Sequence, residues 1–263
     1  MKILDISEHQ GTVDWEALAR QHAAGTLGGV ILRAGHGQTA DRCWQRNAAE
    51  ANRVGVPIGA YWFSEAVSAA EAAAEAETFL RLLEPWRIEL PVAYDLEDWT
   101  ITNRFRPRGV EPAKALCTAM VRSFCEACEA AGYYTMLYTG LWFSDTYYNK
   151  AELFDRFDLW WAQYPYTAPD VTVPPRPCGM WQWGGSEVDG ITPGVKVDTN
   201  EAYRDYPALI RGAGLNRLLP EREEPENAVR WAAERGWMTE AQADTPVRFR
   251  DLARIFYAKE AEK

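Results

Sequence analysis

Short apolar segments alternate with helical patterns along the first half of the chain, and this alternation constrains the fold more than any other feature. The segments are rich in Val, Ile, Leu and aromatic residues and end in polar or glycine-containing loops, which is typical of buried strands. The strands are expected at residues 2–6, 28–34, 56–63, 90–99 and 133–138. The helical patterns between them cover residues 14–20, 42–53, 68–83 and 113–131. Such alternation predicts parallel strands joined by helices.

Three further strand candidates follow, and the helices between them thin out. Residues 159–164, 179–183 and 195–200 are separated by proline-rich loops and at most a short helix. Eight strands in this order predict an α/β fold, a (β/α) barrel whose final third is irregular. Barrel active sites gather at the carboxyl ends of the strands. The polar and aromatic residues at or near such ends are Asp5, Tyr61, Asp95, Glu97, Tyr138, Gln163, Gln182 and Asp198.

Two of these acids, Asp95 and Glu97, stand two residues apart in the apolar segment at 90–99. In a strand, side chains at this spacing face the same side, with Cα atoms about 6.5 Å apart. A neighbouring carboxylate raises the pKa of one of the pair, so that one group can stay protonated near neutral pH while the other ionises. Glycoside hydrolysis divides its labour in this way. Acids after a strand also occur as solvated loop residues or helix caps, so the pair alone does not establish catalysis.

Charge and composition argue against some classes of partner. The 263 residues carry a formal net charge of −10, and binding to nucleic acid or to an anionic membrane surface needs basic patches instead. Twelve Trp and twelve Tyr supply flat rings suited to sugar faces, although most are expected in the core. The N-terminus shows no signal-peptide pattern, so we expect synthesis in the cytoplasm and no segment that spans a membrane.

Five cysteines without the spacing of a disulfide scaffold predict free thiols. Cys125 and Cys128 form a C-x-x-C pattern, but they lie within a helical pattern, with no second pair and no nearby His. We therefore expect no metal site and no cofactor.

Several short motifs occur in one order along residues 1–212. They lie at residues 5–7, 10–11, 14–15, 61–63, 95–97, 159–164, 181–183 and 197–200. As a set they resemble the glycoside hydrolase family 25 lysozymes, the N-acetylmuramidases of bacteria, fungi and many phage endolysins. The resemblance implies a flattened barrel with five β/α units and three closing strands.

The resemblance also implies a role for each matching residue. Glu97 matches the general acid, and Asp95 matches its partner carboxylate, which acts as a nucleophile or orients the acetamido group of the substrate. Asp5 and Asp198 match two supporting acids on the first and last strands. The residues expected to bind substrate are Tyr61, Tyr138, Trp161, Gln163 and Gln182.

On this basis we expect a peptidoglycan hydrolase that cleaves the β-1,4 bond between N-acetylmuramic acid and N-acetylglucosamine, reaching the bacterial cell wall through a holin or through lysis of the cell. Retention of anomeric configuration is expected, because carboxylates two residues apart leave no gap for a water molecule. A wall-binding module that has lost catalysis is one alternative. A chitin-type barrel glycosidase is another, although such strands usually carry several alternating acids and position 93 here is Ala.

The composition changes past Gly212, and we place a linker at residues 213–225 and a helical tail at residues 226–263. The tail contains two helical patterns with an apolar face and weakly resembles a single surface-layer-homology repeat. Docking on the barrel, formation of a homodimer or attachment to the cell wall would each bury that face.

Overall fold

The computed structural model describes residues 1–97, 109–167 and 169–218 of the chain. These residues belong to the first of two compact units, Met1–Leu218, and the second unit, Leu219–Lys263, lies outside them. The predicted tail helices, the homodimer contact and the resemblance to a surface-layer-homology repeat therefore concern residues outside the described part of the chain. Among the described helices, none is both long enough and apolar enough to cross a lipid bilayer.

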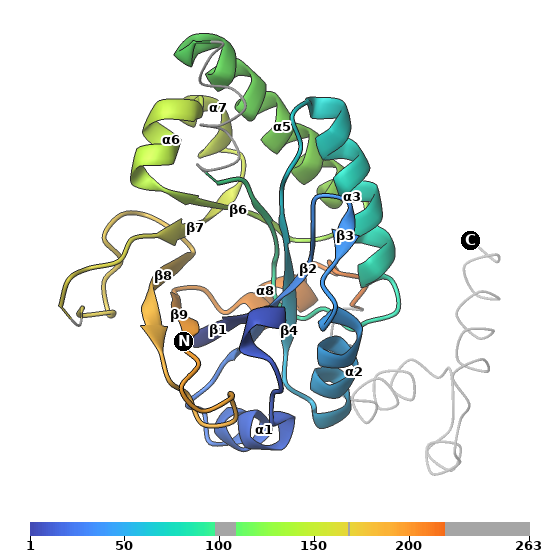
Figure 1. Cartoon of the computed structure of the whole chain (residues 1–263), viewed down its shortest axis with the longest axis vertical. Coiled ribbons are helices and arrows are strands. Elements are labelled where there is room, and N and C mark those ends of the chain that lie inside the picture. The colour runs from blue at the N-terminus through green and yellow to red at the C-terminus, as the bar shows by residue number, and fades with distance from the viewer. Residues whose placement is uncertain (98–108, 168, 219–263) are drawn as a thin grey trace, which may run out of the picture. The chain divides into compact units, whose positions relative to one another are not determined.

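The strands of the described chain form one nine-stranded sheet (Figure 1). They are β1 (Lys2–Ile6), β2 (Gly29–His36), β3 (Thr39–Ala40), β4 (Ile58–Phe63), β5 (Val92–Asp95), β6 (Thr135–Gly140), β7 (Asp158–Ala162), β8 (Met180–Ser186) and β9 (Val197–Ala202). All except β3 close into a barrel, because β1 pairs with both β2 and β9. β9 runs antiparallel to its neighbours β8 and β1, whereas the other barrel pairs are parallel. The predicted barrel is confirmed, and β9 distinguishes it from an all-parallel TIM barrel.

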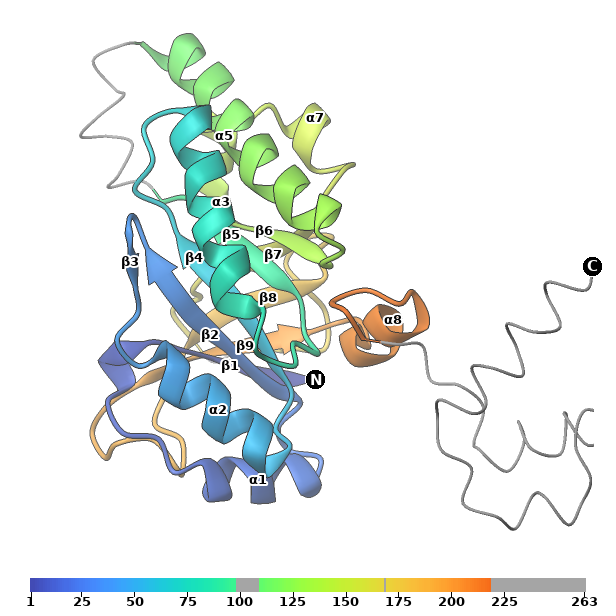
Figure 2. The same cartoon turned by 90° about the vertical axis from the view of Figure 1, so that its right-hand side faces the viewer.

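Helices follow the first five barrel strands. They are α1 (Trp15–Ala23), α2 (Trp44–Val54), α3 (Ala69–Leu83), α5 (Val110–Ala130), α6 (Leu141–Tyr147), α7 (Lys150–Leu153) and, after the last strand, α8 (Tyr206–Gly212). Between β7, β8 and β9 the described residues form loops without a helix. The expected five β/α units and three closing strands are therefore confirmed. Figure 2 shows α3 and α5 side by side over β4, β5 and β6.

Local signals start and stop these helices where the sequence predicts. The Asp14 carboxylate accepts a hydrogen bond from the Ala17 N–H (3.0 Å) at the start of α1, and the Ser68 hydroxyl accepts one from the Glu71 N–H (3.2 Å) at the start of α3. α2 ends at Gly55, whose φ of 77° is left-handed. Glycine adopts this conformation without the strain that a Cβ would cause.

The glycine-rich segment at residues 35–37, which follows the strand predicted at residues 28–34, begins as part of that strand and not as a loop. β2 continues to His36, and its end pairs with β3, which the sequence did not reveal. A Cβ at Gly35 would lie 2.5 Å from the carbonyl oxygen of Thr39 and 2.5 Å from the ring of Trp62. Glycine is required here because two backbones and an indole approach closely.

Side chains on the strands alternate between the barrel interior and the layer under the helices. The interior core includes Ile3, Ile31, Ala93, Met136, Trp160 and Met180. The layer under the helices includes Leu4, Val30, Val92, Tyr94 and Leu137. Because the period is two, the next interior positions toward the carboxyl ends belong to polar side chains. These are Asp5, Asp95, Tyr138 and Gln182.

Residues after α8 close the opposite end of the barrel. Asn216 is 3% exposed; its side chain accepts a hydrogen bond from the Tyr134 N–H (2.7 Å) and donates one to the Leu90 carbonyl (2.9 Å). These backbone groups lie just before β5 and β6, so Asn216 satisfies them where the strands begin. Residues up to Leu218 therefore belong to the first compact unit. Single polar contacts of this kind leave no hydrophobic period in the sequence.

Candidate active site

A cavity of about 170 Å³ opens at the carboxyl ends of the parallel barrel strands, beside the start of the antiparallel β9. Seven of the eight barrel strands contribute to its wall directly or through the residues that follow them. The lining residues are Asp5, Tyr61, Phe63, Asp95, Glu97, Tyr138, Trp160, Tyr164, Gln182 and Asp198. All four predicted acids are therefore brought together, as are the predicted substrate-binding residues Tyr61, Tyr138 and Gln182.

The central acid pair lies at the end of β5, but only Asp95 belongs to the strand, whereas the prediction placed both acids within one strand. Asp95 is the last residue of the strand and is 6% exposed, and Glu97 is half-buried two residues further on. Burial raises the pKa of Asp95 well above its usual range, and the charges of Glu97 and Asp5 raise it further, whereas the Arg33 guanidinium lowers it. The pair therefore holds a proton more readily than two isolated carboxyls would, which general acid catalysis requires.

A second acid of the cavity, Asp5, is held from two strands. Its Oδ2 accepts hydrogen bonds from Gln182 Nε2 (3.1 Å) and from Asn200 Nδ2 (2.8 Å). Burial raises the pKa of Asp5 to about 7, and the charge of Asp198 adds to the effect, whereas the two hydrogen bonds lower it. Asp198 is the register partner of Asp5 on β9 and lies at the exposed rim.

Hydroxyl and amide groups connect the floor of the cavity. The Tyr138 hydroxyl donates a hydrogen bond to Gln182 Oε1 (2.7 Å), and the Tyr164 hydroxyl donates to the same oxygen. Trp160 Nε1 donates to Asn200 Oδ1 (2.7 Å). Burial raises the pKa of Tyr138 well above its usual range, so this hydroxyl remains a donor across the physiological range.

Two residues predicted to bind substrate do not line this cavity. Trp161 is fully buried, with its ring under the Arg176 guanidinium at 4.1 Å. Gln163 is exposed after β7, and its Oε1 accepts a hydrogen bond from Trp161 Nε1 (3.3 Å). The neighbouring Trp160 faces the cavity instead, because adjacent residues of a strand point to opposite sides.

Several residues of the site were not among those predicted. Trp160, Tyr164 and Phe63 line the cavity, and Asn200 holds Asp5. Trp160 could have been found from the alternation within the run at 159–164. Its partners in the neighbouring strands, Tyr138 and Met180, also face the barrel interior. The sequence offers no comparable signal for Arg33, whose Nε binds Asp41 Oδ2 at 2.8 Å.

A second cavity of about 310 Å³ adjoins the first, and the two share Glu97, Tyr138 and Tyr164. Its other lining residues come mostly from β6 and α6 and are mostly apolar, and Trp142 among them is 55% exposed. Glu97 therefore lies where an acidic cavity meets an aromatic one. An acid flanked by flat rings suits a chain of sugar units that extends past the point of cleavage.

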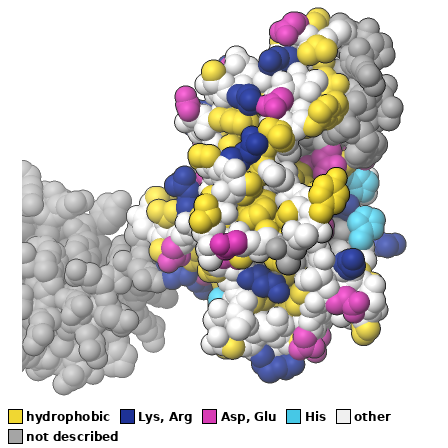
Figure 3. Space-filling model, turned by 90° about the vertical axis from the view of Figure 1, so that its left-hand side faces the viewer, with side chains coloured by type: hydrophobic (Ala, Val, Ile, Leu, Met, Phe, Trp, Pro, Cys, Tyr) yellow, Lys and Arg dark blue, Asp and Glu magenta, His cyan; other side chains and the backbone are white. Residues whose placement is uncertain are grey.

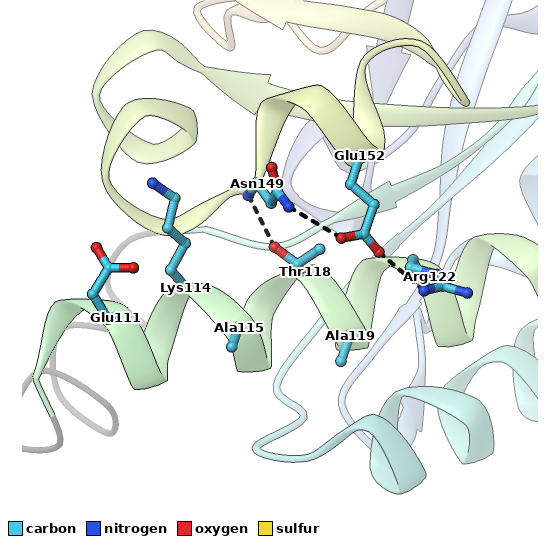
Figure 4. Close-up of a pocket in the computed structure, with 8 residues that line it drawn as sticks. All are labelled: Glu111, Lys114, Ala115, Thr118, Ala119, Arg122, Asn149 and Glu152. Carbon is cyan, nitrogen blue, oxygen red and sulfur yellow. Dashed lines mark hydrogen bonds and ion pairs between the residues drawn. The ribbon is translucent and has the colours of Figure 1, made fainter.

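A hollow of about 450 Å³ between α5 and the α6–α7 segment lies apart from this site (Figure 4). The Asn149 N–H donates a hydrogen bond to the Thr118 hydroxyl (2.9 Å), and Asn149 Nδ2 donates to Glu152 Oε2 (3.2 Å). Glu152 also pairs with Arg122 (3.0 Å). These groups bind one another, so the hollow is part of the packing contact between α5 and the α6–α7 segment.

Among the residues that the structure describes, no group of three His, Cys, Asp or Glu side chains could hold a metal ion. All five cysteines are free thiols, three of them buried on α5. On the face shown in Figure 3, basic and acidic side chains are scattered among apolar ones.

Comparison with known proteins relates this site to a family of enzymes. The family model described as glycosyl hydrolases family 25 matches residues 4–191, which include Asp5, Asp95 and Glu97 but not Asp198. None of the curated proteins matches the sequence.

Solved structures show the same fold. The modular autolysin LytC from Streptococcus pneumoniae, in complex with a synthetic peptidoglycan ligand, is similar with a TM-score of 0.62 and 25% identity, over 76% of this chain and 46% of that one. The chain thus spans about half the length of that autolysin. The catalytic domain of endolysin ply40 from bacteriophage P40 of Listeria monocytogenes is similar with a TM-score of 0.62 and 22% identity, over 81% and 97% of the two chains. The bacterial lysozyme from Streptomyces coelicolor has a TM-score of 0.56 and 21% identity, over 80% and 96%.

Proposed function

The chain belongs to glycosyl hydrolases family 25, and we propose that it hydrolyses the β-1,4 bond between N-acetylmuramic acid and N-acetylglucosamine in bacterial peptidoglycan. The observation that carries the proposal is the position of Asp95 and Glu97 together at the mouth of the barrel, where an acidic and an aromatic cavity meet. The similarity to an autolysin solved with a synthetic peptidoglycan ligand supports this substrate. Host lysis by a phage endolysin remains a prediction.

Each acid has a defined task in this proposal. Glu97 donates a proton to the glycosidic oxygen, so that the leaving sugar departs as an alcohol. Asp95 either attacks the anomeric carbon or orients the acetamido group of the substrate to do so, and water then completes the hydrolysis. Asp5, held by Gln182 and Asn200, has a pKa of about 7, and in its ionised form it adds negative charge beside the positive charge that develops on the sugar ring.

Reducing ends released from purified peptidoglycan test the proposal directly. Borohydride reduction of the products should convert N-acetylmuramic acid, and not N-acetylglucosamine, into its alditol, since the cleaved bond leaves muramic acid at the new reducing end. Release from chitin but not from peptidoglycan would favour the chitin-type alternative. Sedimentation with cell walls in the absence of any new reducing end would favour a binding module.

The spacing of the acid pair also predicts the stereochemistry. Carboxylates two residues apart leave no room for a water molecule between the second acid and the far face of the ring, so the anomeric configuration should be retained. Proton NMR of the first product should show the β-anomer before mutarotation. Initial appearance of the α-anomer would exclude this mechanism.

The aromatic cavity should contribute to binding more than to chemistry. Trp142→Ala is expected to raise KM by roughly 5- to 30-fold, the equivalent of about 1–2 kcal/mol, with kcat within about twofold of wild type, because the ring can stack on a sugar that does not react. Tyr166→Ala is the matched control, since this fully exposed ring lines neither cavity. A loss of kcat at unchanged KM would place Trp142 at the reacting sugar instead.

A further inference from the structure

A carboxyl group lies buried in the middle of α3, behind the wall of the cavity. Glu75 is 1% exposed, and burial raises its pKa to about 7 against hydrogen bonds that lower it. It lines neither of the two cavities of the candidate active site. The other buried residues of the helix are apolar, among them Ala72, Ala76 and Phe79. Because burying an acid costs free energy, the hydrogen bonds of Glu75 are informative.

These hydrogen bonds end on the residues that follow β4. The Ser64 hydroxyl donates to Glu75 Oε2 (2.7 Å), and the Glu65 N–H donates to Glu75 Oε1 (2.9 Å). The Ser64 oxygen in turn accepts from the Tyr94 hydroxyl (2.7 Å) and from the Ala66 N–H (3.2 Å). Ser64 thereby uses its one donor and both of its acceptor positions.

The same residues hold the end of β5 that carries the acid pair. The Ser64 N–H donates to the carbonyl oxygen of Asp95 at 2.7 Å. Tyr94 directly precedes Asp95 on β5, and Phe63, which precedes Ser64, is the register partner of Asp95. Phe63 and Asp95 both line the cavity. The network therefore joins α3 to β4 and β5 at the point where their side chains reach the site.

We infer that Glu75 is a positioning residue, which acts through Ser64 and Tyr94 to fix the Asp95 carboxyl in the cavity. A carboxylate suits this task because each of its oxygens accepts a hydrogen bond, one from the hydroxyl and one from the N–H. Glutamine has a single acceptor oxygen, so either the Glu65 N–H or the Ser64 hydroxyl loses its acceptor. A displacement of about 1 Å at reacting groups can cost about 10²-fold in rate.

Kinetics of Glu75→Gln test the positioning role of Glu75, and this test rests on the proposed hydrolysis. We expect kcat to fall by about 10- to 100-fold with KM within about twofold, because ground-state binding in the cleft is left intact. Glu77→Gln is the matched control, the same change on the exposed face of the same helix, and should keep wild-type kinetics. Phe79→Leu replaces a buried ring on α3 by a smaller apolar side chain and changes no polar group. It therefore shows how far a loss of helix packing alone lowers kcat. Tyr94→Phe should lower kcat in the same direction, and its effect should not add to that of Glu75→Gln.

A second readout does not require activity. The ¹³C resonance of the Asp95 carboxyl, assigned by its disappearance in Asp95→Asn, should shift in Glu75→Gln and remain in place in Glu77→Gln and Phe79→Leu. If wild type releases no reducing ends, the proposed function fails while this shift still tests the positioning. An unshifted resonance, or a fall in kcat no larger than that of Phe79→Leu, would overturn the inference.

Discussion

Glu97→Gln is expected to lower the rate of peptidoglycan hydrolysis by about 10²- to 10⁴-fold, the usual contribution of a general acid. The amide has the shape of the carboxyl but cannot deliver a proton to the leaving oxygen. Glu97 is half-buried at the junction of two cavities and follows the end of β5, so the change should leave the barrel core untouched. Release of reducing ends from purified cell walls measures the loss.

Two controls separate chemistry from folding in this experiment. Circular dichroism and the melting temperature of Glu97→Gln should match those of wild type, and Glu77→Gln, the same change at an exposed position of α3, should keep full activity. Asp95→Asn should also lose activity, since it removes the partner carboxylate. If Glu97→Gln kept more than about a tenth of the wild-type rate, the proton donor would have to be another group.

Asp5→Asn is expected to stabilise the protein at pH 8 while lowering its activity. Burial raises the pKa of Asp5 to about 7 in the folded protein from its ordinary value of 3.8. The folded state therefore keeps a proton that the unfolded state releases, so the stability present below about pH 4 is lost as pH rises through 7. The full pKa shift corresponds to about 4 kcal/mol of unfolding free energy. Because the titrations of Asp5 and Asp198 are coupled, we expect the variant to gain only about 1–3 kcal/mol of stability at pH 8.

The hydrogen bonds of Asp5 make asparagine a suitable replacement. Both bonds, from Gln182 and from Asn200, end on the same oxygen, Oδ2. An asparagine that places its Oδ1 there keeps both of them and cannot ionise. The change thus removes the cost of a buried charge without leaving a donor unsatisfied.

Urea denaturation at pH 4, 6 and 8 measures this effect. The difference in free energy of unfolding between Asp5→Asn and wild type should be close to zero at pH 4 and grow toward pH 8. Wild type itself should lose stability over the same range, and Glu75, with a pKa of about 7, adds to that loss. A difference that is the same at all three pH values, or a variant less stable than wild type at pH 8, would contradict the assignment.

Much of the fold could be predicted because its signals are local. Strand and helix periods lie within single segments, so the barrel strands and the helices that follow the first five of them appear where the alternation predicts. The N-caps Asp14 and Ser68 are local in the same sense. The contacts of Asn216 could not be predicted, because they are made with residues distant in the sequence. β3 pairs with the nearby end of β2, but it has only two residues, too few to show a period in the sequence.

The candidate site also has features that the sequence could predict and features that it could not. The strand-end rule predicted that Asp5, Asp95 and Glu97 converge, since it depends only on the order of the elements. The choice between Trp160 and Trp161 depends on the side to which each residue points, and a slip of one residue in register reverses that choice. Because the two side chains point to opposite sides, the cavity is lined by Trp160 and not by Trp161.

The sequence by itself determined the order of strands and helices and the kinds of side chain at the strand ends, because both follow from periods of two and of 3.6 residues. Only the tertiary structure decided which of those side chains share a cavity and which carboxyls keep a proton. Asp5 lies beside Asp198 and Asn200 only because β1 pairs with β9, a strand far from it in the sequence. The pKa of Asp5 then follows from its burial and from those neighbours, which no local segment of the sequence contains.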